Sequence, residues 1–169
     1  DEEGRCALFG RHWPLQLEKL AAEGWPGYPA RLLARERARS LRLVLRVLAL
    51  EAQRPYFRVL WNERQLQLPT SAGVMTLRVD RLDEDEQGRR WLIDYKSGVP
   101  DRFRMADGEA QPLQLALYEQ ALALQEEPVQ GLALLSLAPA RLGFSGAAPE
   151  QLWPGTWQRV PDWDVQRER

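Results

Sequence analysis

The sequence has few of the residues that most often bind transition metals. Cys6 is its one cysteine, so no intrachain disulfide, thiolate zinc site or cysteine-bound iron–sulfur cluster can form within these residues. His12 is the one histidine. Lysine is also scarce: Lys19 and Lys96 are the two lysines among 23 basic residues, the others being arginine. Because this chain uses arginine at nearly every basic position, the lysine at position 96 indicates a specific role.

Long apolar runs are also absent, and none approaches the roughly 20 residues that a membrane helix needs. The N-terminus, DEEGRCALFG, lacks the basic start and apolar core of a signal peptide. We therefore expect a soluble cytoplasmic protein with no membrane contact. Its 169 residues suffice for one core, so we expect a single domain over residues 1–169, and the abrupt start indicates a piece of a larger protein. The net charge of −1 means that DNA would have to be bound by a local basic patch.

One long helix is predicted over residues 30–53, which contain no proline or glycine and repeat apolar residues with helical spacing. Arginines at positions 31, 35, 39, 42 and 46 follow the same period and form a basic stripe. Two interpretations remain open. The stripe is either a solvated face with local ion pairs such as Glu36–Arg39, or a ridge that contacts DNA phosphates through Arg35, Arg39 and Arg42.

The residues after Pro55 predict a sheet. Alternating patterns and turn residues indicate three or four antiparallel strands within residues 56–60, 65–68, 74–82 and 90–96. A helix is expected from Pro112 to about Glu127, and the apolar run 129–138 predicts a strand buried on both faces. Beyond Pro139 the chain is rich in proline, glycine and tryptophan, which predicts an irregular segment. The expected fold class is α/β, with a mixed central sheet of four or five strands flanked by helices.

The chemistry is concentrated in the predicted hairpin. Opposed residues of a hairpin have numbers with a constant sum, so a turn centred near Gln87 places Asp80 opposite Asp94, with Lys96 on the same side. Adjacent carboxylates repel unless a cation joins them, and their hard oxygens suit Mg²⁺ or Mn²⁺. Such an ion polarises phosphate oxygens and acidifies bound water, while a lysine stabilises the transition state. The pattern predicts metal-assisted phosphodiester cleavage; the alternative is a surface ion pair of Asp94 with Lys96.

Three motifs in order, RVDRLD, WLIDYKSG and QLALY, resemble those of the PD-(D/E)XK nuclease superfamily, and within it nuclease domains of the RecB and AddB type. The resemblance covers roughly residues 36–146 and implies a restriction-endonuclease-like core. It implies that Asp80, Asp94 and the backbone carbonyl of Tyr95 bind the metal and that Lys96 is the catalytic lysine.

A glutamine–tyrosine motif completes the resemblance, with Gln114 and Tyr118 expected to hold the DNA strand near the metal. They are four residues apart and share a helix face, although core packing is an alternative for Tyr118. Related domains often have a further ligand upstream; Glu36, Glu51 and Glu63 are the candidates, and Glu63 lies nearest the sheet. The cysteine cluster of AddB-type domains and any GxxxxGK[ST] phosphate loop are absent, so an ATP-driven motor would lie on another segment or subunit.

Together these features predict a Mg²⁺-dependent DNA nuclease of recombination or repair, an exonuclease rather than an endonuclease. It would act on single-stranded DNA or a duplex end as part of a larger helicase–nuclease protein. The alternative is a nuclease-like domain that has lost catalysis and serves as a DNA-binding or protein-docking module. A third hypothesis is a structural domain whose motif match arises by chance. It would be favoured if Asp80 and Asp94 lay on opposite faces of the sheet.

Overall fold

The computed structural model describes residues 7, 10–16, 18, 30–97, 113–125, 127–151 and 153–160. It divides into two compact units, Asp1–Glu51 and Ala52–Arg169. In the first unit, residues 10–16 are helical and helix α2 spans Ala30–Glu51, which confirms the long helix predicted from the sequence. Among the described residues, no helix combines the length and apolar character needed to cross a membrane.

Helix α2 carries its arginines on its surface. All five members of the stripe are exposed, namely Arg31, Arg35, Arg39, Arg42 and Arg46. The predicted local ion pair is present, with Arg39 Nε 3.4 Å from Glu36 Oε2. Ala34 and Ala38, two of the apolar residues that recur with helical spacing in this segment, are exposed. Leu33, Leu41 and Leu45 are half-buried.

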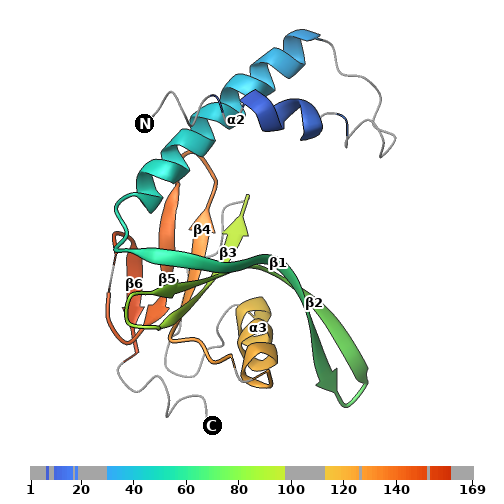
Figure 1. Ribbon diagram of the computed structural model, residues 1–169, viewed down its shortest axis with the longest axis vertical. Coiled ribbons are helices and arrows are strands. Elements are labelled where there is room, and N and C mark those ends of the chain that lie inside the picture. Colours follow the sequence, from blue (N-terminus) through green and yellow to red (C-terminus); the bar gives the residue numbers. More distant parts are fainter. Residues whose placement is uncertain are drawn as a thin grey trace. The chain divides into compact units, whose positions relative to one another are not determined.

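The described part of the second unit forms one six-stranded sheet in the order β1-β2-β3-β4-β5-β6 (Figure 1). The strands are β1 (Phe57–Thr70), β2 (Gly73–Asp85), β3 (Arg90–Lys96), β4 (Gly131–Ser136), β5 (Gly143–Ala148) and β6 (Thr156–Arg159). Strands β3 and β4 are parallel, as are β5 and β6, and the other neighbours are antiparallel. The predicted mixed α/β class is confirmed.

The sheet has more strands than the sequence predicted because the segment after Pro139 is not irregular. Its glycines allow close strand pairing: a Cβ at Gly146 would lie 2.1 Å from the Leu132 carbonyl oxygen, and one at Gly131 would lie 2.2 Å from the Trp91 ring. The tryptophans pack on one another, with ring centroids of Trp91 and Trp153 4.5 Å apart. Residues typical of turns here permit the close approach of strands and rings.

The β1–β2 hairpin is longer than predicted, since residues 57–70 form one strand rather than two. Its register shifts between Val59 and Trp61, and Glu63 has a positive φ of 49°. Val79 and Leu82 both belong to the main core cluster, although strict alternation would place residues three apart on opposite faces. The hairpin therefore changes the facing of its side chains at the level of residues 79–82.

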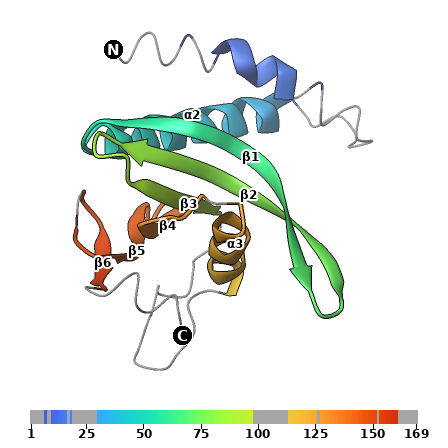
Figure 2. The same cartoon turned by 60° about the horizontal axis from the view of Figure 1, so that its bottom comes forward.

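Helix α3 (Leu113–Ala123) connects the parallel strands β3 and β4 and lies on one face of the sheet beside the long hairpin (Figure 2). It contributes Leu115, Tyr118, Ala121 and Leu122 to a core that also contains Leu82, Leu92 and Leu132. All six residues of β4 are buried, which confirms the strand predicted to be covered on both faces. The apolar side chains of α3 thus pack against those of β3 and β4 on this face of the sheet.

The outermost strands of the described sheet differ from the central ones. Strand β1 alternates buried leucines with exposed polar residues, and Arg58 on it pairs with Glu84 of β2 at 2.6 Å. Strand β6 has four residues. The central strands β3 and β4 are buried along most of their length.

Two glycines of β5 give a matched test of this packing. Gly146→Ala is expected to lower the free energy of unfolding by about 1–3 kcal/mol, because the new methyl group would overlap a backbone oxygen of β4. Gly143→Ala is expected to be tolerated, since a Cβ there would meet nothing within 4 Å. Urea unfolding of both variants measures the difference, and equal stabilities would contradict the β4–β5 pairing.

Candidate active site

The β2–β3 register places Asp80 and Asp94 at the same level. Arg81 pairs with Ile93 and Leu82 with Leu92, so paired residues have the constant sum that the sequence predicted. The pairing of β2 with β3 ends at Arg81. Beyond it, Asp80 Oδ2 accepts a hydrogen bond of 2.8 Å from the backbone N–H of Tyr95, the residue that follows Asp94. The Asp80 carboxylate therefore takes the place of a backbone partner where the two strands separate.

Asp94 is a buried carboxylate in the central strand, with 1% of its surface exposed. Lys96 Nζ lies 2.6 Å from its Oδ2, and apart from this ion pair the described residues offer Oδ2 no hydrogen-bond partner. Burial raises the pKa of Asp94, Lys96 opposes that rise, and the charge of Asp80 adds to it. The ammonium group of Lys96 thus offsets part of the cost of burying the Asp94 charge. The repulsion from Asp80 and the loss of hydration still favour the protonated form.

A chain of contacts runs from Asp94 back to the hairpin. Lys96 Nζ donates to Gln114 Oε1 at 2.5 Å, and Gln114 Nε2 donates to the Tyr118 hydroxyl. That hydroxyl donates in turn to the backbone carbonyl of Arg78 at 2.7 Å. Five polar groups from β3, α3 and β2 are therefore joined in one line, and Lys96 is held between a carboxylate and an amide oxygen.

The donor and acceptor roles in this chain are set by chemistry. Lysine only donates, so the amide of Gln114 must present its oxygen to Lys96 and its nitrogen to Tyr118. The Tyr118 hydroxyl then accepts from Gln114, which leaves its proton for Arg78. Burial raises the pKa of Tyr118, and the charges of Asp94 and Asp80 raise it further, so the hydroxyl keeps its proton at neutral pH. Tyr118 is both a core residue, with 4% of its surface exposed, and a member of the site.

The donor set can be tested against the divalent cation that the sequence resemblance implies. Within the described ranges, no group of three or more Asp, Glu, His or Cys side chains is close enough to hold a metal ion. Two neighbouring carboxylates are nevertheless present, and one of them is buried with a raised pKa. Mg²⁺ commonly keeps several waters and takes one or two carboxylates. Asp80, Asp94 and a backbone carbonyl therefore fit such an ion.

Glu63 and the α2 arginines, which were also singled out in the sequence, are not grouped with this pair by any contact described above. Glu63 stands level with Asp80 in the β1–β2 register, but its side chain is 66% exposed and lies 3.8 Å from Arg78 Nη2. The structure does not group it with Asp80 and Asp94. Arg35, Arg39 and Arg42 lie on α2, in the first unit.

An ionic network on the face of the sheet opposite α3 was not predicted from the sequence. Arg81 binds the buried Asp83 with two contacts of 2.6 and 2.7 Å, and Arg54 Nη1 lies 2.7 Å from the same carboxylate. Arg81 Nη1 also donates to the Tyr95 hydroxyl at 2.9 Å. The side chain of Tyr95 is thus anchored while its backbone N–H bonds Asp80. Alternation along β2 and β3 could have shown that Arg81, Asp83 and Tyr95 share a face.

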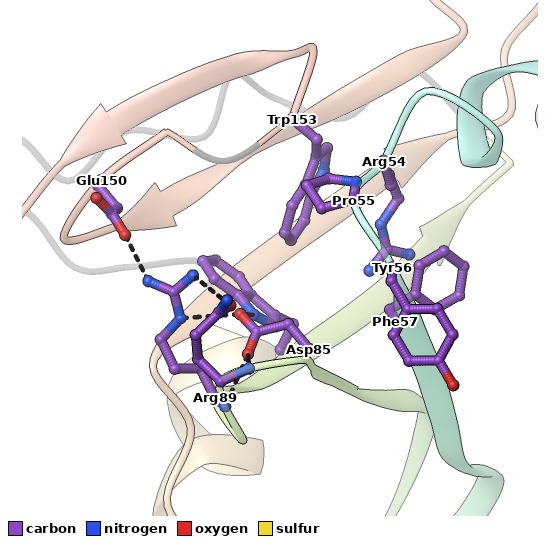
Figure 3. A pocket seen from close by; sticks show the side chains of 10 residues that line it. Arg54, Pro55, Tyr56, Phe57, Asp85, Arg89, Glu150 and Trp153 are labelled. Atoms are coloured by element: carbon purple, nitrogen blue, oxygen red, sulfur yellow. Dashed lines mark hydrogen bonds and ion pairs between the residues drawn. The ribbon is translucent and has the colours of Figure 1, made fainter.

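A separate pocket of about 400 Å³ lies at the other end of β3, around the β2–β3 turn (Figure 3). Arg89 lies 2.8 Å from Asp85 and also pairs with Glu150, and Trp91 Nε1 donates to Asp85 at 3.2 Å. Burial alone would raise the pKa of Asp85, but hydrogen bonds from Arg89 and Trp91 outweigh it and lower the pKa. The carboxylate pair and Lys96 do not line this pocket.

The raised pKa of Asp94 has a consequence for stability. Between its unfolded and folded pKa values the folded protein binds more protons, so the free energy of unfolding falls as pH rises through that window. Asp94→Asn removes this pH-dependent loss of stability because asparagine does not ionise. Lys96, whose side chain is 32% exposed, stays solvated in the variant. In the presence of a chelator, the variant is expected to be at least as stable as the parent chain at pH 8 and to lose that advantage at pH 4. Urea titrations at both pH values test this, and the opposite trend would contradict it.

Comparison with known proteins adds independent information to this geometry. No curated protein matched the chain in a sequence search. The family model of the PD-(D/E)XK nuclease superfamily matches residues 7–161, which is most of the sequence and includes Asp80, Asp94, Lys96, Gln114 and Tyr118. The chain therefore belongs to the PD-(D/E)XK nuclease superfamily.

Proposed function

We propose that this protein is a Mg²⁺-dependent DNA nuclease that hydrolyses phosphodiester bonds at the Asp80–Asp94–Lys96 site. The observation that carries the proposal is the continuous line of contacts from Asp94 through Lys96 and Gln114 to Tyr118. The alternative, an ordinary surface ion pair of Asp94 with Lys96, does not explain these contacts. Exposed ion pairs contribute little to stability and are not usually held by further residues. Here a buried carboxylate and a helix are both used to hold one ammonium group in place.

In this proposal Asp80, Asp94 and the backbone carbonyl of Tyr95 hold the cation. Members of the superfamily generally use divalent metals. When bound, such an ion polarises a phosphate oxygen and lowers the pKa of a coordinated water. Burial of Asp94 fits this role, since a cation relieves both its desolvation and its repulsion from Asp80.

Lys96 supplies the second charge. It is partly exposed, with 32% of its side chain accessible, so a phosphate can reach it. Its ammonium stabilises the extra negative charge that develops on the phosphate in the transition state. Gln114 positions Lys96 by accepting a hydrogen bond from its ammonium group, and the Tyr118 hydroxyl accepts a hydrogen bond from the amide nitrogen of Gln114. This role differs from the direct DNA contact expected from the sequence for these two residues.

The finer assignment follows from the motifs. The order of RVDRLD, WLIDYKSG and QLALY supports a nuclease domain of the RecB and AddB type, acting in recombination or repair within a larger helicase–nuclease protein. The substrate in this proposal is single-stranded DNA or a duplex end, and the action is that of an exonuclease. The exposed Arg35, Arg39 and Arg42 of α2 are suited to contact the phosphate backbone.

Cleavage assays test the catalytic assignment. Asp80→Ala or Lys96→Ala is expected to lower Mg²⁺-dependent cleavage of single-stranded DNA by about 100-fold or more, because the first removes a proposed metal ligand and the second removes the ammonium that stabilises charge on the phosphate. Lys96→Arg is expected to recover only part of the activity, since the guanidinium differs in shape and hydration. Glu86→Ala, at an exposed acidic position in the β2–β3 turn, is the control. Full activity of the Asp80 and Lys96 variants would refute the assignment.

A second candidate function is a nuclease-like domain without catalysis that serves as a DNA-binding or protein-docking module. It is favoured by one observation: the described residues place no third acidic side chain beside Asp80 and Asp94. This candidate requires weak metal binding or none, whereas the nuclease requires a site that is occupied under working conditions.

Calorimetry with Mn²⁺ separates these two functions. The nuclease is expected to bind Mn²⁺, and Asp94→Asn is expected to abolish that binding because it removes the buried carboxylate charge. Asp83→Asn, which alters a buried carboxylate behind the strand, serves as the matched control for general effects on folding. An absence of Mn²⁺ binding by the parent chain would favour the docking module.

A further inference from the structure

The α3 face of the sheet changes in polarity along β3, β4 and β5. Paired residues of neighbouring strands point to the same face, so the strand registers define rows of side chains. The innermost row is Leu92, Leu132 and Ala147; the next is Asp94, Leu134 and Ser145; the last is Lys96, Ser136 and Gly143. The face becomes polar toward the carboxyl ends of β3 and β4, the edge at which open α/β sheets bind ligands.

Ser136 is the unexplained member of the last row. It is the immediate parallel-strand neighbour of Lys96 and has 5% of its surface exposed. In the part of the chain that the structure describes, its Oγ has no hydrogen-bond partner. A buried hydroxyl without a partner destabilises a fold, so a purely structural role would be served better by alanine. Its position beside Lys96 suits a hydroxyl that binds a group held by the ammonium.

Space is available beside this hydroxyl. Gly143, the β5 neighbour of Ser136 in the same row, has no side chain, and a Cβ there would meet nothing within 4 Å. The row therefore presents an ammonium group, a hydroxyl group and an open position in succession. An anion that approaches Lys96 from this side meets two hydrogen-bond donors on adjacent strands.

We propose that Ser136 is a substrate-binding residue, whose hydroxyl donates a hydrogen bond to a non-bridging phosphate oxygen of the DNA strand held at Lys96. The inference rests on the proposed nuclease function. Serine hydroxyls are common phosphate contacts because they donate without adding charge. The missing partner of Oγ is then the phosphate itself, and Gly143 leaves room for it.

The variant Ser136→Ala tests this with three measurements on the full chain. Cleavage of a single-stranded oligonucleotide under subsaturating conditions is expected to fall about 10- to 100-fold, the usual effect of one hydrogen bond to a charged group. The midpoint of thermal unfolding is expected to stay constant or rise by about 2–4 °C, because an unpaired polar group is removed. Mn²⁺ affinity is expected to be unchanged, since Ser136 is not a metal ligand.

Two further variants sharpen the result. Ser136→Thr keeps the hydroxyl, and its extra methyl group has the open position at Gly143 to occupy, so activity is expected to recover. Ser145→Ala removes a hydroxyl from the same face one row inward and is expected to cleave normally. A similar loss in Ser136→Ala and Ser145→Ala would overturn the proposal, as would a Ser136→Ala protein that melts lower or binds Mn²⁺ more weakly.

This proposal and the nuclease function fail in different ways. If Asp80→Ala and Lys96→Ala abolish cleavage while Ser136→Ala cleaves normally, the substrate contact is wrong and the nuclease function stands. If the parent chain neither cleaves the oligonucleotide nor binds Mn²⁺, the proposed function is refuted and the substrate contact falls with it.

Discussion

The structure depends on one constraint, the burial of the Asp94 carboxylate inside the central strand of the sheet. A charge in that position is costly unless other groups compensate it. The compensating charge is that of Lys96 at the end of β3, and α3 brings Gln114 to hold Lys96, whereas the negative charge of Asp80 on β2 adds to the cost. The helix of this crossover therefore holds the Lys96 ammonium in addition to connecting two parallel strands.

Strand β3 is held by polar contacts on both of its faces. On the α3 face, Lys96, Gln114 and Tyr118 form the line that ends at the backbone of β2. On the opposite face, Arg81 joins Asp83 to the Tyr95 hydroxyl. Because alternate residues of one strand enter the two networks, a shift of β3 by one residue would break both. The register at the site is thus determined twice, by independent sets of partners.

Much of this arrangement was predictable because it follows from simple periodicities. The constant sum across a tight turn placed Asp80 level with Asp94, and a four-residue spacing placed Gln114 and Tyr118 on one helix face. The strands β5 and β6 were not predictable, because glycine and tryptophan indicate a turn in isolation and become strand residues only when rings and neighbouring backbones are in place. The contact of Gln114 with Lys96 depends on the placement of α3, which no local pattern encodes.

The outer strands of the described sheet have a consequence for self-association. An open sheet edge is a template on which a second chain can add a strand, and proteins block such edges with charge or short length. Here β1 presents exposed charged residues such as Arg58 and Glu63, with an irregular register and a positive φ, and β6 ends after four residues. The largely buried strands β3 and β4 lie at the centre, where their backbone groups are already paired.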